Sequence, residues 1–116
     1  MEWRPLAWVG SSRRDLRAFP KEVRVVMGRA LEAAQLGGRH PYARVLRGFG
    51  GAGVLEVVDD YDGSTYRAVY TVRFADAVYV LHAFQKKSKH GVETPHFEME
   101  VVRARLARLR RDLKDR

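Results

Sequence analysis

The chain has 116 residues, no cysteine and a formal net charge of +8. This length predicts a single domain, residues 1–116, that can bury a core without cross-links. The missing cysteines exclude disulfides, thiolate metal sites and a cysteine nucleophile. The charge points to a polyanionic partner, first nucleic acid and second an acidic protein. The alternative is a solvated basic surface with no specific ligand.

Membrane and export signals are missing from the sequence. No apolar run approaches the roughly 20 residues of a transmembrane helix. The first five residues, Met1-Glu2-Trp3-Arg4-Pro5, lack the basic and apolar stretches of a signal peptide. We therefore expect a cytoplasmic protein that does not bind membranes.

The first part of the chain predicts one strand followed by two helices. Residues 3–9 are apolar and aromatic, and Pro5 places such a strand at a sheet edge. Two serines then precede a short helix over residues 13–19. Residues 20–36 carry an apolar stripe of helical period, which ends at a Gly-Gly pair.

The next segment contains Leu46-Arg47-Gly48 and Gly50-Gly51-Ala52-Gly53. These glycines lack the Lys-Ser/Thr of a phosphate-binding P-loop and the spacing of a dinucleotide fingerprint. They therefore predict a flexible loop.

The second half predicts a strand meander and a final helix. Three strands are expected, at residues 54–59, 65–74 and 77–85. Asp62-Gly63 is a hairpin signal between the first two of them. Thr94 and Pro95 are typical of a cap and first turn. The resulting order, β-α-α-β-β-β-α, predicts an α+β fold in which helices pack against a mostly antiparallel sheet.

The final helix separates apolar from basic residues. One stripe is expected to pack on the sheet: Met99, Val102, Leu106, Leu109 and Leu113. The other face is expected to hold arginines: Arg103, Arg105, Arg108, Arg110 and Arg111.

Motifs of several enzyme classes are missing. The chain has no Gly-x-Ser-x-Gly elbow and no His-Glu-x-x-His pair. Its histidines are scattered and have no thiolates beside them: His40, His82, His90 and His96. They predict no zinc site, and we expect no cofactor.

Arg67 lies in the middle of the expected central strand. Strand alternation separates it from Tyr66, Ala68 and Tyr70, which we expect to face the core. An outward guanidinium can bind phosphate with two parallel hydrogen bonds, and its removal would change stability little. The alternative is an ion pair with Glu56 on the neighbouring strand.

The following strand ends in a basic segment. Val80, His82 and Phe84 are expected to share one face, where a histidine is either a hydrogen-bonded core residue or a proton carrier. Lys86, Lys87 and Lys89 follow at the strand end. They form either a phosphate-binding edge or a solvated run of charge.

These motifs together resemble a known family. Tyr66-Arg67-Ala68-Val69-Tyr70, Val80-Leu81-His82-Ala83-Phe84-Gln85-Lys86-Lys87 and Thr94-Pro95 are similar to the phage-derived branch of the RelE/HigB toxins. Leu46-Arg47-Gly48 ahead of the sheet is similar too. The resemblance covers most of the chain, and the order and spacing of the motifs carry it.

The resemblance implies the same fold, ribosome-dependent cleavage of messenger RNA, and neutralisation by a cognate antitoxin, of the helix-turn-helix type. It implies that Arg67 contacts the scissile phosphate and that Lys86 and Lys87 are the family's basic pair. The strand before Arg67 departs from the family, because relatives often carry a basic residue on it and this strand reads Leu55-Glu56-Val57-Val58. The last helix also lacks the catalytic tyrosine of the best-studied members.

The expected reaction needs no metal. The RNA 2′-hydroxyl attacks the adjacent phosphorus and leaves a 2′,3′-cyclic phosphate and a 5′-hydroxyl. Arg67 would stabilise the developing charge, the two lysines would hold the backbone, and His82 or His90 would move protons. Further RNA contacts are expected from Arg44, Arg47, Lys89 and Arg103.

Two other interpretations stay open. The chain could be a toxin-fold protein without catalysis, which binds gyrase as ParE-like members do, or which simply binds nucleic acid. It could also be a decayed phage product with no activity.

Overall fold

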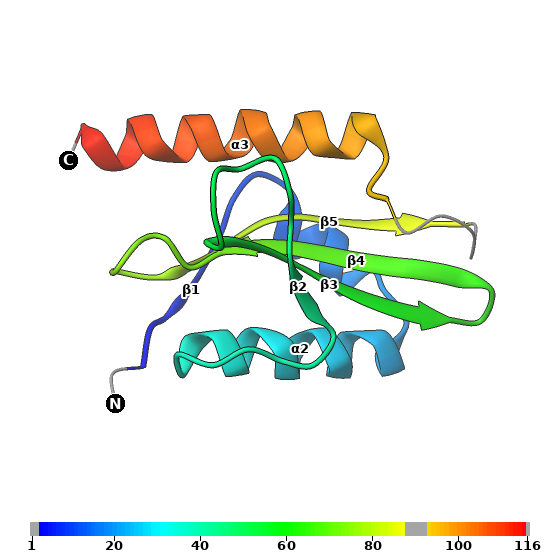
Figure 1. The fold of residues 1–116 in the computed structure, drawn as a ribbon. Coiled ribbons are helices and arrows are strands. Elements are labelled where there is room, and N and C mark those ends of the chain that lie inside the picture. The colour runs from blue at the N-terminus through cyan, green and yellow to red at the C-terminus, as the bar shows by residue number, and fades with distance from the viewer. Residues whose placement is uncertain (1–2, 88–92, 116) are drawn as a thin grey trace.

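The computed structural model describes residues 3–87 and 93–115, in which helices cover both faces of a five-stranded sheet (Figure 1). The strands are β1 (Leu6–Trp8), β2 (Ala43–Val45), β3 (Val54–Tyr61), β4 (Ser64–Thr71) and β5 (Val78–Lys86). The helices are α1 (Ser12–Arg17), α2 (Lys21–Gln35) and α3 (His96–Lys114). None of these described helices is long and apolar enough to cross a membrane.

The strand order in the sheet is β1-β5-β4-β3-β2. Strand β1 pairs with β5 in parallel, and the other neighbours are antiparallel. The predicted α+β class and mostly antiparallel sheet are therefore confirmed, as is the edge position of the first strand. Strand β2 was not predicted, because three residues are too few to show a period and only the pairing with β3 defines them.

The hairpin between β3 and β4 follows the predicted signal. Asp62 and Gly63 have φ angles of 49° and 82°, and the flanking residues Tyr61 and Ser64 are paired. Two consecutive positive φ angles are typical of a type I′ turn, whose twist matches that of the strands.

The sheet separates two hydrophobic cores. Tyr66, Ala68 and Tyr70 face α1 and α2, as alternation predicted, while Val69 belongs to the core beneath α3. Helix α3 buries Val102, Leu106 and Leu109 of its predicted apolar stripe; Met99 and Leu113 are half-buried beside them. The central strand β4 is thus covered on both faces, which decides the surroundings of Arg67.

A bulge in β5 shifts the expected alternation. Val69 of β4 pairs with His82, but the next residue, Tyr70, pairs with Val80, so Leu81 is an extra residue. Val80 consequently packs in the α1–α2 core, whereas His82 stacks on Phe84 and contacts α3. The prediction that Val80 shares a face with His82 is therefore wrong.

Arg105 does not belong to the exposed basic face of α3. Its guanidinium donates to the carbonyl oxygen of Leu81 at 2.9 Å and to Ser11 Oγ at 3.0 Å. It therefore ties α3 to β5 and to the start of α1. The other arginines of the predicted basic face are exposed: Arg103, Arg108, Arg110 and Arg111.

Gly10 provides a test of this packing, because its φ is +57° and an added Cβ would lie 2.8 Å from Arg105 Nε. We predict that Gly10→Ala lowers the free energy of unfolding by about 1–3 kcal/mol, through backbone strain and displacement of Arg105. Gly28 in α2 is the control, since an added Cβ there meets nothing within 4 Å. Gly28→Ala should stabilise by about 1 kcal/mol. Urea unfolding measures both, and an unchanged Gly10→Ala would contradict the packing of Arg105.

Candidate phosphate-binding site

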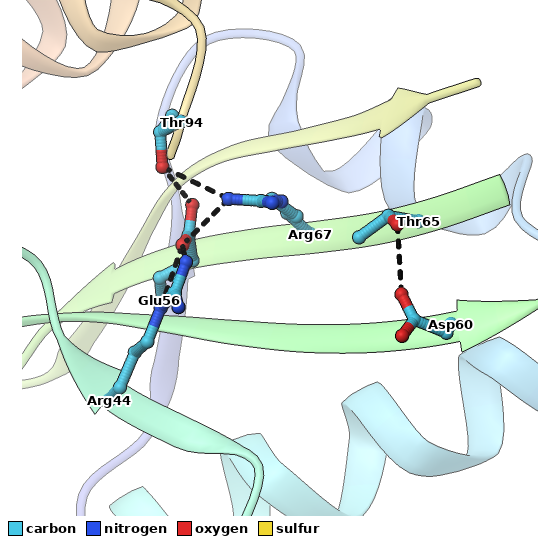
Figure 2. Close-up of polar contacts among 6 residues, drawn as sticks. All are labelled: Arg44, Glu56, Asp60, Thr65, Arg67 and Thr94. Atoms are coloured by element: carbon cyan, nitrogen blue, oxygen red, sulfur yellow. Dashed lines mark hydrogen bonds and ion pairs between the residues drawn. The ribbon is translucent and has the colours of Figure 1, made fainter. Parts of the chain in front are cut away.

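A buried charge cluster joins three strands to the start of α3 (Figure 2). Glu56 comes from β3, Arg67 from β4 and Arg44 from β2, and Thr94 lies just ahead of α3. The side chains of Glu56 and Arg67 are 0% and 2% exposed, whereas that of Arg44 is 40% exposed. The cluster therefore has an inner pair and one arginine at the surface.

Glu56 is the centre of this cluster. Its Oε1 accepts hydrogen bonds from Arg44 Nη2 at 2.9 Å and from Arg67 Nη1 at 3.2 Å. Its Oε2 accepts from the Thr94 hydroxyl at 2.6 Å. One carboxylate thus meets two guanidinium groups, and the cluster carries a net charge of +1.

The expectation that Arg67 faces outward is wrong, because its side chain is buried and forms the alternative ion pair with Glu56. Alternation placed Arg67 correctly on the face opposite Tyr66 and Tyr70. It could not indicate that α3 and the segment containing Thr94 cover that face. A guanidinium in such surroundings needs a carboxylate partner, because an unpaired buried charge is very costly.

Thr94 was predicted to cap α3, but its hydroxyl has another role. The helix begins with Pro95 at the N-cap position and has no side-chain cap hydrogen bond. The Thr94 hydroxyl instead donates to Glu56 and accepts from Arg67 Nη1 at 3.3 Å. It therefore fastens the beginning of α3 to the buried ion pair.

A pocket of about 560 Å³ lies beside the cluster. Its volume falls in the usual range of ligand sites, roughly 300–1,000 Å³. The lining residues come from β2, the loop after it and the beginning of α3: Arg44, Val45, Leu46, Arg47, Glu93, Thr94 and Met99. Two arginines over an apolar wall can hold a phosphate and an adjacent apolar group or base.

His82 is held inside the protein. Its Nε2 lies 3.0 Å from Glu98 Oε1, and its Nδ1 lies 3.3 Å from Arg105 Nη1. Because arginine can only donate, Nδ1 accepts and Nε2 carries the proton that is shared with Glu98. This arrangement corresponds to the hydrogen-bonded core histidine rather than to an exposed proton carrier.

The remaining predicted residues that the structure describes do not gather at one point. Lys86 ends β5 opposite Thr65, and the exposed Lys87 follows it. Arg103 lies on α3 beside the loop that contains Gly48. Lys89 and His90 lie outside the described residues. The structure therefore brings Arg44 and Arg47 together at one pocket, while Lys86 and Lys87 lie at the end of β5.

Groups with raised pKa values lie on the other face of the sheet. Burial raises the pKa of Asp59, and the Asp60 carboxylate raises it further. The hydrogen bond to Glu22 raises the pKa of Tyr61, and burial raises that of Tyr70. Tyr61 and Tyr70 pack in the α1–α2 core, and Asp59 is paired with Tyr66 of that core. They take no part in the pocket.

Metal binding finds no support in the described part of the chain, where no three histidine or acidic side chains gather in a way that could hold an ion. Arg44 and Arg47 offer the chemistry of fixed cations at the pocket: attraction of an anion, orientation by paired hydrogen bonds, and stabilisation of developing negative charge.

These features define an α+β protein with an arginine-lined pocket beside a buried ion pair. A family model described as "Phage derived protein Gp49-like" matches residues 14–107, so the chain belongs to that family. This match confirms the predicted phage-derived branch.

Among solved structures, the chain is similar to one in the toxin–antitoxin complex RelBE2 from Mycobacterium tuberculosis. The identity is 22% and the TM-score 0.46, with 76% of this chain and 97% of that chain covered. No curated protein matches the sequence.

Breaking the buried pair tests its role. We predict that Arg67→Met lowers the free energy of unfolding by about 3–5 kcal/mol, because Glu56 then keeps a buried charge without its inner partner. The double variant Glu56→Met with Arg67→Met should recover most of that loss, since it removes both buried charges. Urea unfolding of the single and double variants gives the coupling between the two residues. If the two substitutions lower the free energy of unfolding additively in the double variant, a direct ion pair would be contradicted.

Proposed function

We propose that this chain is the toxin of a toxin–antitoxin pair and cleaves messenger RNA on the ribosome, acting as one domain over residues 1–116. Membership of the Gp49-like family and the resemblance of its motifs to RelE/HigB toxins support this proposal. The observation that carries it is the pairing of one buried carboxylate with two arginines, of which Arg44 reaches the pocket.

In the proposed complex, Arg44 rather than Arg67 contacts the RNA phosphate. Arg67 balances the charge of Glu56. Glu56 Oε1 in turn holds the Arg44 guanidinium, because it accepts hydrogen bonds from Arg44 Nε and Nη2 at 3.3 and 2.9 Å. Arg67 is thus a positioning residue. Arg47 lines the same pocket and adds a second cation.

The proposed reaction is a metal-free transesterification. The 2′-hydroxyl oxygen bonds to phosphorus while the bond from phosphorus to the 5′-oxygen breaks. One proton leaves the 2′-hydroxyl and another is given to the 5′-oxygen. Because His82 is bonded inside the protein, we assign the first transfer to His90. The second would fall to Lys86 or Lys87, which the family resemblance places at the RNA, although both lie at the end of β5 rather than in the pocket. The guanidinium of Arg44 would stabilise the negative charge that develops on the phosphoryl oxygens.

The proposed partner is an antitoxin of the helix-turn-helix type that covers this basic pocket. An acidic segment would be attracted to Arg44 and Arg47 and would exclude RNA from them. Complexes of this kind weaken as salt screens the charges.

A second candidate is a toxin that acts without catalysis, by binding gyrase or another protein. The internal bonding of both Arg67 and His82 favours it, since neither side chain is available to a substrate. Mapping transcript ends in arrested cells separates the two functions: new ends with a 5′-hydroxyl indicate RNA cleavage, and intact transcripts indicate a protein target.

We predict that Arg44→Gln lowers messenger RNA cleavage about a hundredfold or more, the usual effect of losing a fixed group that stabilises a developing anion. Arg44→Lys should recover part of this activity, because an ammonium group lacks the paired donors of guanidinium.

Arg29→Gln is the matched control for Arg44→Gln, since Arg29 is exposed on α2 at the other face of the sheet and its loss changes the net charge equally. Primer extension on ribosome-bound messenger RNA measures cleavage, and thermal melting checks the fold. Equal activity of the Arg44 and Arg29 variants would contradict the assignment of Arg44.

A further inference from the structure

A second arginine-lined pocket lies between α3 and the glycine-rich loop. It has a volume of about 320 Å³. The lining residues are Gly48, Phe49, Arg73, Arg103, Leu106, Ala107 and Arg110. No acidic residue is among them in the part of the chain that the structure describes. Three cations therefore border one hollow without a carboxylate lining it.

The loop and α3 fix two of these arginines. Arg73 donates to the backbone carbonyl of Phe49 and packs against Gly53. Arg103 lies over the ring of Phe49, 5.5 Å from its centroid. Arg103 also pairs with Glu100 at 2.8 Å, but both side chains are about half exposed, and such a pair contributes little and exchanges readily.

Helix geometry places Arg103 and Arg110 on the same side of α3. They are seven residues apart, which is about two turns and roughly 10 Å along the axis. All four exposed arginines of this helix carry the same charge, but only Arg103 and Arg110 line the pocket, and Arg108 and Arg111 do not. The same helix therefore holds two pairs of arginines in different surroundings.

Gly48, whose φ is +100°, lines the second pocket and directly follows Arg47 of the first. A Cβ on Gly48 would lie 3.2 Å from Arg103 Nη2 and 3.7 Å from Met99 Cε. Met99 lines the first pocket, and Arg103 and Gly48 line the second. Glycine at this position thus allows the loop to come close to α3. Arg44 and Arg47 line the pocket on one side of Gly48, and the arginines of the second pocket lie on the other side.

A polymer of phosphates fits this arrangement better than a single carboxylate does. Guanidinium groups bind phosphate through paired hydrogen bonds, and successive cations along a groove follow a charged backbone. The half-buried Phe49 adds an aromatic ring at the groove, beside which a base can stack.

We propose that Arg73, Arg103 and Arg110 bind the backbone of single-stranded RNA, on the far side of Gly48 from the phosphate held by Arg44. This inference rests on the proposed function and extends it, because it gives the direction in which the RNA leaves the first pocket. The contact requires a strand long enough to reach both pockets.

The test uses two 2′-O-methyl RNA oligonucleotides, which lack the attacking hydroxyl and are therefore not cleaved. One has about 4 nucleotides and the other about 12, which covers typical site sizes on single strands. Affinities are measured over a range of salt for the intact protein and three variants: Arg44→Gln, Arg103→Gln with Arg110→Gln, and Arg108→Gln with Arg111→Gln. The last is the matched control, since it removes the same charge from the same helix.

The Arg103/Arg110 variant should bind the short probe as the parent does and the long probe more weakly. For the long probe, the slope of log affinity against log salt concentration should become smaller by about 1.4 in this variant, because it loses two phosphate contacts and each contributes about 0.7 on a single strand. The control should keep the parental slope. Arg44→Gln should weaken binding of both probes. Thermal melting verifies that each variant folds.

If the Arg103/Arg110 variant and the control lose equal affinity for the long probe, the inference is overturned, since the arginines would then act only through net charge. If the Arg103/Arg110 variant loses affinity for a poly-glutamate peptide but not for RNA, the groove binds an acidic partner, and the inference is likewise wrong. Both results leave the proposed function intact when Arg44→Gln still weakens RNA binding. A parent protein that binds neither probe would overturn both proposals.

Discussion

The ion pair between Glu56 and Arg67 is the constraint on which the rest of the site depends. It lies between the sheet and the start of α3, where each buried charge is stabilised by the other. Its remaining partners are consequently fixed: Thr94 fastens the beginning of α3, and Arg44 is drawn to the outer side of the same carboxylate. One buried interaction thus sets the position of a helix and orients the cation at the pocket.

Coverage of the sheet on both faces explains where the functional groups gather. Helices α1 and α2 bury one face and α3 the other, so the centre of the sheet offers no open surface (Figure 1). On the side that α3 covers, the charged side chains that line pockets lie along a flank of this helix. On one flank the glycine-rich loop rises to the helix and encloses two arginine-lined pockets. On the other, Arg105 and Glu98 are engaged with His82 and serve the packing of α3.

The residue types that chemistry would assign to catalysis therefore have different roles here. An arginine in a central strand and a histidine on the next strand look like a phosphate ligand and a base, yet both are bonded inside the protein. Their contribution to RNA binding would be indirect, through the position of Arg44 and of α3. Such support of a site by buried polar groups is common, because a ligand-binding cation is useful only when its own partners hold it in place.

Local patterns in the sequence determined the order of the longer elements, the α+β class and the hairpin at Asp62-Gly63, because apolar period and turn chemistry are properties of neighbouring residues. They also placed Arg67 on the correct face of β4. Three results depended on contacts between distant residues: the bulge at Leu81, the strand β2, and the cover that buries Arg67 against Glu56. From the sequence alone, Arg44 was predicted to contact RNA. Its place beside the pocket was decided by tertiary structure, because only the folded chain brings β2, β3 and the start of α3 to one carboxylate.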